Sequence, residues 1–269
     1  METRQKHSLL DHPILTAIVL PVTSILGISL LTSILSSFFA DAALAEINVS
    51  SVIQSVLRIF LAFLIIAVMK RGGKFRFGFS KKKLLLSFAL ASAGFLIAVY
   101  NIVQGILLQS PLQATAGGIL SALLGGIAPG FFEEIVCRGI VLSNMMVRWR
   151  TRSNFILRSV LASGIIFGLI HLLNAIDAGI GMTIIQIGYA AGIGIFFGAV
   201  YVRTRNLWGP VFIHAAADIS TYLFIRDTSA VSEAADWISG AIIAIGYTLV
   251  GLCLIRPCKH REISALWND

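Results

Sequence analysis

The chain has 269 residues, of which 57% are hydrophobic and only 13% are charged, and its formal net charge at pH 7 is +8. Soluble domains carry about 25% charged residues, so this chain lacks the polar side chains that a soluble fold needs for its surface. Its three cysteines are too few, and an odd number, for a framework of disulfides. The composition therefore excludes a soluble globular protein, a disordered chain and a disulfide scaffold, and indicates an integral membrane protein.

Eight segments are long and apolar enough to be transmembrane helices, which need about 20 residues each. In chain order they are Pro13–Phe39, Val52–Met69, Leu84–Leu108, Gly118–Val147, Ser159–Ile176, Gly181–Val202, Leu207–Ile225 and Trp237–Ile255. The first segment, followed by Ala43-Leu44-Ala45, imitates a signal peptide, but its apolar run is longer than usual for one, so we expect it to be retained. The predicted fold is an all-α, multi-pass membrane bundle in which residues 1–269 form a single integral membrane domain.

The distribution of basic residues supports eight spans, because cytoplasmic loops of membrane proteins collect Lys and Arg. If the eight segments alternate across the membrane, 18 of the 21 Lys and Arg residues lie on one side. We therefore expect both termini in the cytoplasm and the protein in the plasma membrane. The largest basic loop, residues 70–83, carries interleaved phenylalanines, and we interpret it as binding anionic lipid headgroups rather than nucleic acid.

Ionisable residues inside membrane spans are costly and usually mark function. Those within the predicted spans are Arg58, Glu133, Glu134, Arg138, His171, His214 and Asp218. All but the first fall within residues 118–225, and we expect the helices of this region to carry the chemistry.

The first motif is Glu133-Glu134-x-x-x-Arg138. Glu134 and Arg138 are four residues apart, so they can form an ion pair on one helix face. Glu133 points about 100° away and has no such partner, which makes it a candidate general base. The alternative is that both carboxylates merely neutralise Arg138. The preceding Pro129-Gly130 pair predicts a kink or break just before the carboxylates.

The other two motifs are Phe167-x-x-x-His171 and His214-x-x-x-Asp218. A lone histidine on an apolar helix is more often a core residue than a catalyst, although Phe167, one turn earlier, would shield His171 from water. The four-residue spacing brings His214 and Asp218 together, and a carboxylate can fix the tautomer of an imidazole. A hydrogen bond that only packs helices is the alternative. The small residues between them, Ala215-Ala216-Ala217, allow another helix to approach closely.

Together and in this order, on separate hydrophobic helices, the three motifs resemble the CPBP family over roughly Ala128–Ile225. This family comprises the type II CAAX prenyl proteases and bacteriocin-processing intramembrane endopeptidases, also called the Abi family. The resemblance implies hydrolysis of peptide bonds in membrane-associated or CAAX-like substrates that enter from the membrane or the cytoplasmic side.

The resemblance also implies a role for each motif residue. Glu133 and His171 would activate water, and His214 and Asp218 would stabilise the oxyanion. Glu134, Arg138 and Phe167 would orient the site. The family commonly has Asn at the position of Asp218. An ionised Asp cannot donate a hydrogen bond, so Asp218 would act while protonated, orient His214 only, or bind a metal.

Three alternatives remain open at the level of sequence. Two histidines and a carboxylate can bind zinc, with Glu133, His171 and His214 as the ligands, although we expect no cofactor. A non-catalytic immunity or scaffold protein that binds a peptide or membrane partner is a second alternative. The third is a transporter, which predicts an internal repeat that the sequence does not show.

Overall fold

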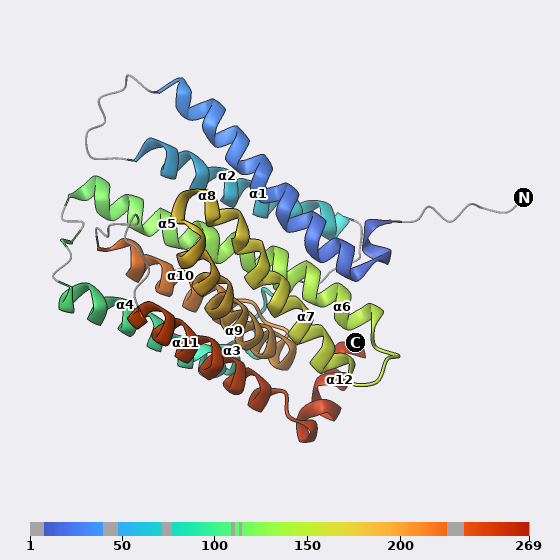
Figure 1. The fold of residues 1–269 in the computed structure, drawn as a ribbon. Coiled ribbons are helices and arrows are strands. Elements are labelled where there is room, and N and C mark those ends of the chain that lie inside the picture. Colours follow the sequence, from blue (N-terminus) through green and yellow to red (C-terminus); the bar gives the residue numbers. More distant parts are fainter. Residues whose placement is uncertain are drawn as a thin grey trace, which may run out of the picture.

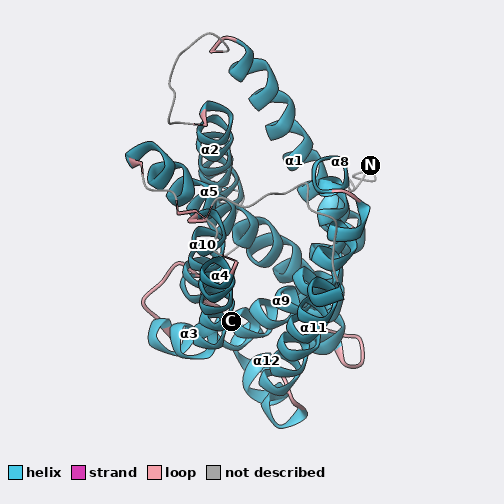
Figure 2. Ribbon diagram, turned by 60° about the vertical axis from the view of Figure 1, so that its left-hand side comes forward, coloured by secondary structure: helices cyan, strands magenta, loops and turns pink. Residues whose placement is uncertain are grey.

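The computed structural model describes residues 8–39, 48–71, 77–108, 111–112, 115–224 and 234–268. Over these residues the chain forms helices joined by loops, with one isolated antiparallel bridge between Leu112 and Phe224 (Figures 1 and 2). The predicted all-α bundle is therefore confirmed. The Ala43-Leu44-Ala45 motif and residues 72–76 of the basic loop lie outside the described residues.

Each of the eight predicted segments is helical. The corresponding elements are α1 (Pro13–Ser37), α2 (Val49–Arg71), α3 (Leu84–Ala91) with α4 (Phe95–Leu107), α5 (Ala116–Glu134) with α6 (Ser143–Arg148), α7 (Phe155–Ile170), α9 (Ile180–Thr204), α10 (Trp208–Tyr222) and α11 (Ala234–Leu254). The short helices Leu9–Asp11, Ser92–Gly94, His171–Asn174, α8 (Ala175–Ala178) and Pro257–Lys259 connect or extend them.

Seven helical stretches of the described chain are long and apolar enough to cross a membrane. The eighth, α10, has 15 residues and is shorter than a typical spanning helix. The protein is thus a multi-pass membrane protein, while the count of eight spans and the cytoplasmic termini stay predictions.

Basic segments meet at one end of the bundle. The start of α1, the end of α6 and α12 (His260–Asn268) all lie toward the right-hand end in Figure 1. Ion pairs join them there, because Arg148 pairs with Asp11, and Glu262 lies 3.6 Å from Arg203 and 3.9 Å from Lys83. This common end agrees with the predicted gathering of Lys and Arg on one side.

The helix α12 was not predicted from the sequence. It begins just after α11 and is anchored to the end of α9. The indole of Trp267 donates to the carbonyl of Val202 at 3.0 Å, and Arg205 donates to the carbonyl of Leu266 at 3.1 Å. Its mixed polar and apolar residues lack the long apolar run by which the other helices were identified.

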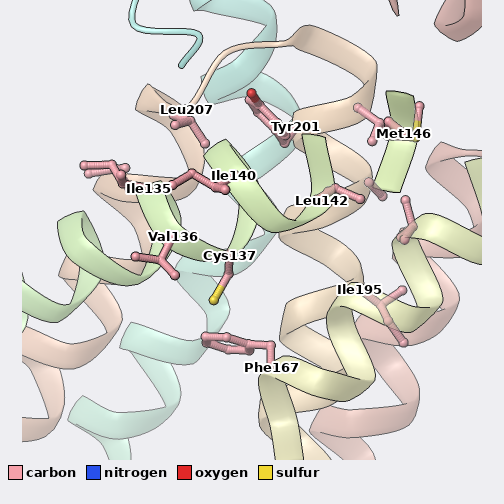
Figure 3. Close-up of a cluster of buried hydrophobic side chains, with 14 of the residues drawn as sticks. Ile135, Val136, Cys137, Ile140, Leu142, Met146, Phe167, Ile195, Tyr201 and Leu207 are labelled. Atoms are coloured by element: carbon pink, nitrogen blue, oxygen red, sulfur yellow. The ribbon is translucent and has the colours of Figure 1, made fainter. Parts of the chain in front are cut away.

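The core lies around a π-helix, Ile135–Leu142, that continues α5. All eight of its residues are buried. Figure 3 shows Ile135, Val136, Cys137, Ile140 and Leu142 in a cluster with residues from α7, α9 and the start of α10, including Phe167, Ile195 and Leu207. At the end of this segment the Ser143 hydroxyl donates to the carbonyl of Arg138 at 3.1 Å. Such π-turns inside helices are frequent at functional sites.

The structure shows no break at Pro129-Gly130. The helix α5 continues through Pro129 to Glu134, and the change of helical geometry comes after the two carboxylates. Gly130 instead permits close packing, since a Cβ there would lie 2.7 Å from the backbone nitrogen of Ala215. This tight contact with α10 sets Glu133 and Glu134 beside His214.

Candidate active site

The predicted ion pair of the first motif is present and fully buried. Arg138 Nη1 donates to Glu134 Oε1 at 2.7 Å, with side-chain exposures of 1% and 0%. Arg138 Nη2 donates to the carbonyl of Gly194 on α9 at 3.3 Å, and its guanidinium lies 4.4 Å from the ring centroid of Phe167. The arginine is thus held by a carboxylate, a carbonyl and an aromatic face, which together offset the cost of burying its charge.

Glu134 has a second partner that the sequence does not indicate. His214 Nδ1 lies 2.9 Å from the same Oε1 atom that accepts from Arg138. Because an ionised carboxylate can only accept, Nδ1 carries the hydrogen of this bond. Glu134 therefore fixes the orientation of the His214 ring, and Nε2 is left facing the other side of the site.

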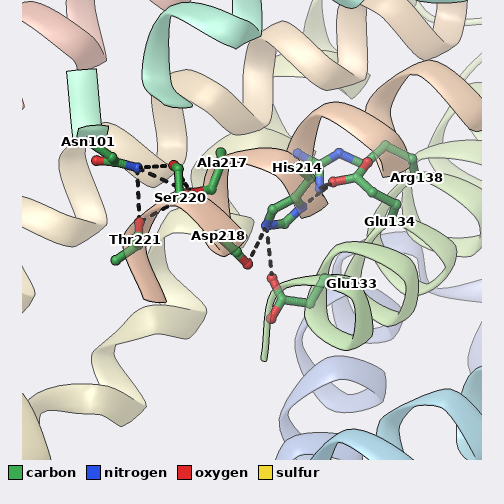
Figure 4. A network of polar contacts seen from close by, with 9 residues as sticks. All are labelled: Asn101, Glu133, Glu134, Arg138, His214, Ala217, Asp218, Ser220 and Thr221. Carbon is green, nitrogen blue, oxygen red and sulfur yellow. Dashed lines mark hydrogen bonds and ion pairs between the residues drawn. The ribbon is translucent and has the colours of Figure 1, made fainter. Parts of the chain in front are cut away.

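Two further carboxyl groups lie on that other side (Figure 4). His214 Nε2 is 3.9 Å from Glu133 Oε2 and 3.6 Å from Asp218 Oδ2. These distances exceed those of a hydrogen bond. The side chains of Glu133 and Asp218 are 19% and 31% exposed, compared with 12% for His214. The structure thus brings both carboxyl groups to the imidazole without a direct bond and leaves them accessible.

His171 lies apart from this network. The helix α7 ends at Ile170, and the partly buried His171 begins the following short helix. Its Nδ1 bonds to the carbonyl of Phe167 at 2.9 Å, so that Nε2 is the nitrogen left for another partner. Among the described residues, His171 makes no direct bond to Glu133, His214 or Asp218. The ring of Phe167 contacts both imidazoles, since its centroid lies 5.0 Å from the His171 ring and 6.2 Å from the His214 ring.

Two aromatic rings line the buried side of the site, on which Glu134 and Arg138 lie and which we call the closed side. The predicted Phe167 is one, and Phe197 of α9, which the sequence does not single out, is the other. The Phe197 ring lies 5.9 Å from the His214 ring and 5.7 Å from the Arg138 guanidinium. Nothing in the sequence distinguishes Phe197 from the other 16 phenylalanines, because only the packing of α9 brings it here.

The zinc alternative requires Glu133, His171 and His214 to come together around one ion. Within the part of the chain that the structure describes, no group of three or more His, Cys, Asp and Glu side chains is arranged to hold a metal ion. Of the three ligands considered from the sequence, Glu133 and His214 come together, whereas His171 turns Nδ1 to a carbonyl and does not join them.

Comparison with known proteins bears on the same part of the chain. A search of the curated proteins and a search of the solved structures found no match. The model of the family described as type II CAAX prenyl endopeptidase Rce1-like matches residues 113–220, which is less than half of the chain but contains all three motifs. The motif-bearing helices of this membrane protein thus carry the pattern of the Rce1-like type II CAAX prenyl endopeptidases, which confirms the resemblance seen in the sequence.

Proposed function

We propose that the protein is an intramembrane endopeptidase of CAAX-like, membrane-associated substrates, in which Glu133 activates the attacking water. The observation that carries this proposal is the different environment of the two adjacent glutamates. Glu134 is buried and bonded to Arg138 and His214, whereas Glu133 is accessible and makes no direct hydrogen bond within the described part of the chain. The carboxylate of Glu134 thus holds the site together, and that of Glu133 is available to accept a proton.

The reaction follows from this arrangement. Glu133 takes a proton from water, and the resulting hydroxide attacks the carbonyl carbon of the scissile peptide bond. The tetrahedral intermediate then collapses as the C–N bond breaks, and Glu133 returns the proton to the leaving amine. We assign His171 the role of holding the attacking water through its Nε2, as the family resemblance implies.

His214 is placed to stabilise the oxyanion. Its Nδ1 is anchored on Glu134, so the ring cannot turn freely, and Nε2 faces Glu133 on the accessible side. A doubly protonated ring donates from Nε2 to the developing negative charge. Fixed donors of this kind act most strongly in a site shielded from bulk water, and here Phe167 and Phe197 supply part of that shield.

Asp218 assists His214 from the next turn of α10. An ionised carboxylate 3.6 Å from Nε2 favours the charged imidazole, whereas a protonated one can itself donate to the oxyanion. Only the second role corresponds to the Asn that the family commonly has at this position, because an amide donates but carries no charge.

The test is cleavage by the purified protein in liposomes. The probe is an internally quenched peptide that ends in a farnesylated CAAX-type sequence. We expect Glu133→Gln to reduce kcat by about 10²- to 10⁴-fold, the usual contribution of a general base. His214→Ala and His171→Ala should also lose activity. Arg158→Gln, at the exposed cytoplasmic-side start of α7, is the matched control and should cleave normally.

Three outcomes would overturn the proposal. Unchanged cleavage by Glu133→Gln would exclude this residue as the base. Loss of wild-type activity with a strong chelator, restored by zinc, would replace the metal-free mechanism with a zinc-dependent one. Peptide binding without cleavage by the wild type would support the non-catalytic alternative.

A further inference from the structure

Arg58 is an intramembrane cation that lies outside the three motifs. It sits in α2 on the helix face that is turned into the protein, because Ser55, three residues before it, and Ala62, four residues after it, are both buried. Arg58 itself is only partly buried. A charged residue at this depth is expensive unless it has an anionic partner.

The packing of α2 on α5 places Arg58 near the accessible side of the site. Both helices run in the same direction in Figure 1, and the rings of Phe63 and Phe131 meet with centroids 5.4 Å apart. Arg58 lies five residues before Phe63, so it is level with Gly126, five residues before Phe131. At that level the ring of Tyr222 packs on α5, 3.3 Å from where a Cβ of Gly125 would stand.

Arg58 therefore lies at the level of Tyr222. Tyr222 is itself one helical turn after Asp218 on α10. Arg58 acts electrostatically on both of these residues. Unlike Arg138, however, Arg58 forms no direct hydrogen bond or ion pair among the described residues. A guanidinium thus lies beside the proposed proteolytic site, and its N–H groups are available to hydrogen-bond a ligand.

We propose, as an extension of the proposed function, that Arg58 binds a carboxylate of the peptide substrate. A guanidinium presents a planar fork of donors that matches a carboxylate, and such pairs are strong where water is scarce. The carboxylates of a peptide are its C-terminus and its Asp and Glu side chains, and both offer the same chemistry.

The spacing favours the C-terminal carboxylate. From the level of Arg58 to Glu133 there are seven residues of α5, a rise of about 10 Å. Three residues of extended peptide span about the same length. A substrate whose scissile carbonyl lies at Glu133 would therefore bring a C-terminus three residues further on to Arg58. Its remaining chain would point toward the basic end of the bundle.

The experiment compares two farnesylated, quenched peptides without acidic side chains that differ only in a free or an amidated C-terminus. For the wild type we expect a KM about tenfold or more lower for the acid, since a hydrogen bond to a charged group is lost in the amide. Arg58→Gln should raise the KM of the acid far more than that of the amide, so that the preference for the free C-terminus is lost. Arg58→Lys should keep part of the preference, and the control Arg158→Gln all of it.

A third peptide, amidated but ending in Glu, identifies the source of the carboxylate. A low KM for it that depends on Arg58 would show that a side-chain carboxylate also binds, which supports the proposal. An equal loss for acid and amide in Arg58→Gln, or no preference in the wild type, would overturn it and leave Arg58 as a counter-ion of Asp218.

Failure of the proposed function gives a different result. If the wild type cleaves none of the peptides, their affinities for the intact protein still report the acid–amide difference by fluorescence anisotropy. The same binding measurement on Glu133→Gln separates recognition from hydrolysis. If Arg58→Gln unfolds in a thermal scan, Arg58→Lys carries the comparison.

Discussion

The two sides of the His214 ring differ in how their polar groups are bonded. On the closed side, Glu134 and Arg138 are fully buried and joined at 2.7 Å, and His214 binds the same carboxylate at 2.9 Å. On the accessible side, Glu133 and Asp218 approach the ring at 3.9 and 3.6 Å and form no direct hydrogen bond with it. Neighbouring residues of one helix thus serve different purposes, because a rotation of about 100° takes one into the core and the other to the accessible side.

The largest expected effect comes from breaking the closed side. Arg138→Leu leaves Glu134 as a buried carboxylate without its cation, and breaking a buried pair in this way costs about 3–5 kcal/mol. Unfolding of the purified protein in mixed micelles measures the change in the free energy of unfolding. Replacing both partners, as in Glu134→Gln with Arg138→Leu, should recover part of the loss, and a single-variant cost below about 1 kcal/mol would contradict the structural role.

A change at Gly130 tests whether the arrangement of the carboxylates around the His214 ring depends on the close contact of α5 with α10. The added methyl of Gly130→Ala would lie 2.7 Å from the backbone nitrogen and 2.9 Å from the Cα of Ala215, so α10 must move. We expect a cost of about 1–3 kcal/mol, as for overpacked cores, together with reduced cleavage.

The matched control for Gly130 is Gly188→Ala on α9, where a Cβ meets nothing within 4 Å. This variant should retain stability and activity. Equal behaviour of the two variants would mean that the helix contact does not set the site.

On the accessible side, Asp218→Asn should have a smaller effect. An amide can donate to the oxyanion as a protonated carboxyl group does, so we expect kcat to stay within about tenfold of the wild type. Asp218→Ala removes both functions and should lose more. The measurement is the same peptide cleavage assay. If Asp218→Asn is as inactive as Asp218→Ala, the reaction requires the charge of Asp218.

The smallest effect is expected from an exposed ion pair at the end of the bundle. Slight burial opposes it, but Arg203, Lys259 and Lys83 together hold the pKa of Glu262 below its ordinary value. At pH values above that ordinary pKa, the ionised carboxylate therefore stabilises the packing of α12. This contribution is lost as the pH falls through the lowered pKa.

We expect Glu262→Gln to destabilise α12 by less than about 1 kcal/mol at neutral pH. The difference from the wild type should vanish in acid. Hydrogen exchange of residues 260–268, with both proteins compared at each pH, measures it. A difference that persists at low pH would show that Glu262 does not act through its charge.

The sequence was sufficient for features that depend on local spacing or on long apolar runs. Hydropathy located the eight helical segments, and the four-residue spacing located the Glu134–Arg138 and His214–Asp218 pairs. It was not sufficient for the bond between Glu134 and His214, because that contact joins positions 80 residues apart through the packing of α5 on α10.

Other features were missed for reasons that are also physical. Proline usually disrupts a helix, but α5 continues past Pro129, and Gly130 lets it pack closely on Ala215. The helix α12 has no long apolar run, and its place depends on contacts with the end of α9. Phe197 and Arg58 come close to the site only in the assembled bundle.

The two carboxylate oxygens of Glu134 accept different numbers of hydrogen bonds. Oε1 accepts from both Arg138 and His214, whereas Oε2 is buried without a hydrogen-bond partner among the described residues. This asymmetry should widen the separation between the antisymmetric and symmetric stretching bands of the carboxylate. Isotope-edited spectra of the protein in lipid would then give a band that shifts whenever α5, the π-helix or α10 moves, and so an optical reporter of the assembled centre that needs no substrate.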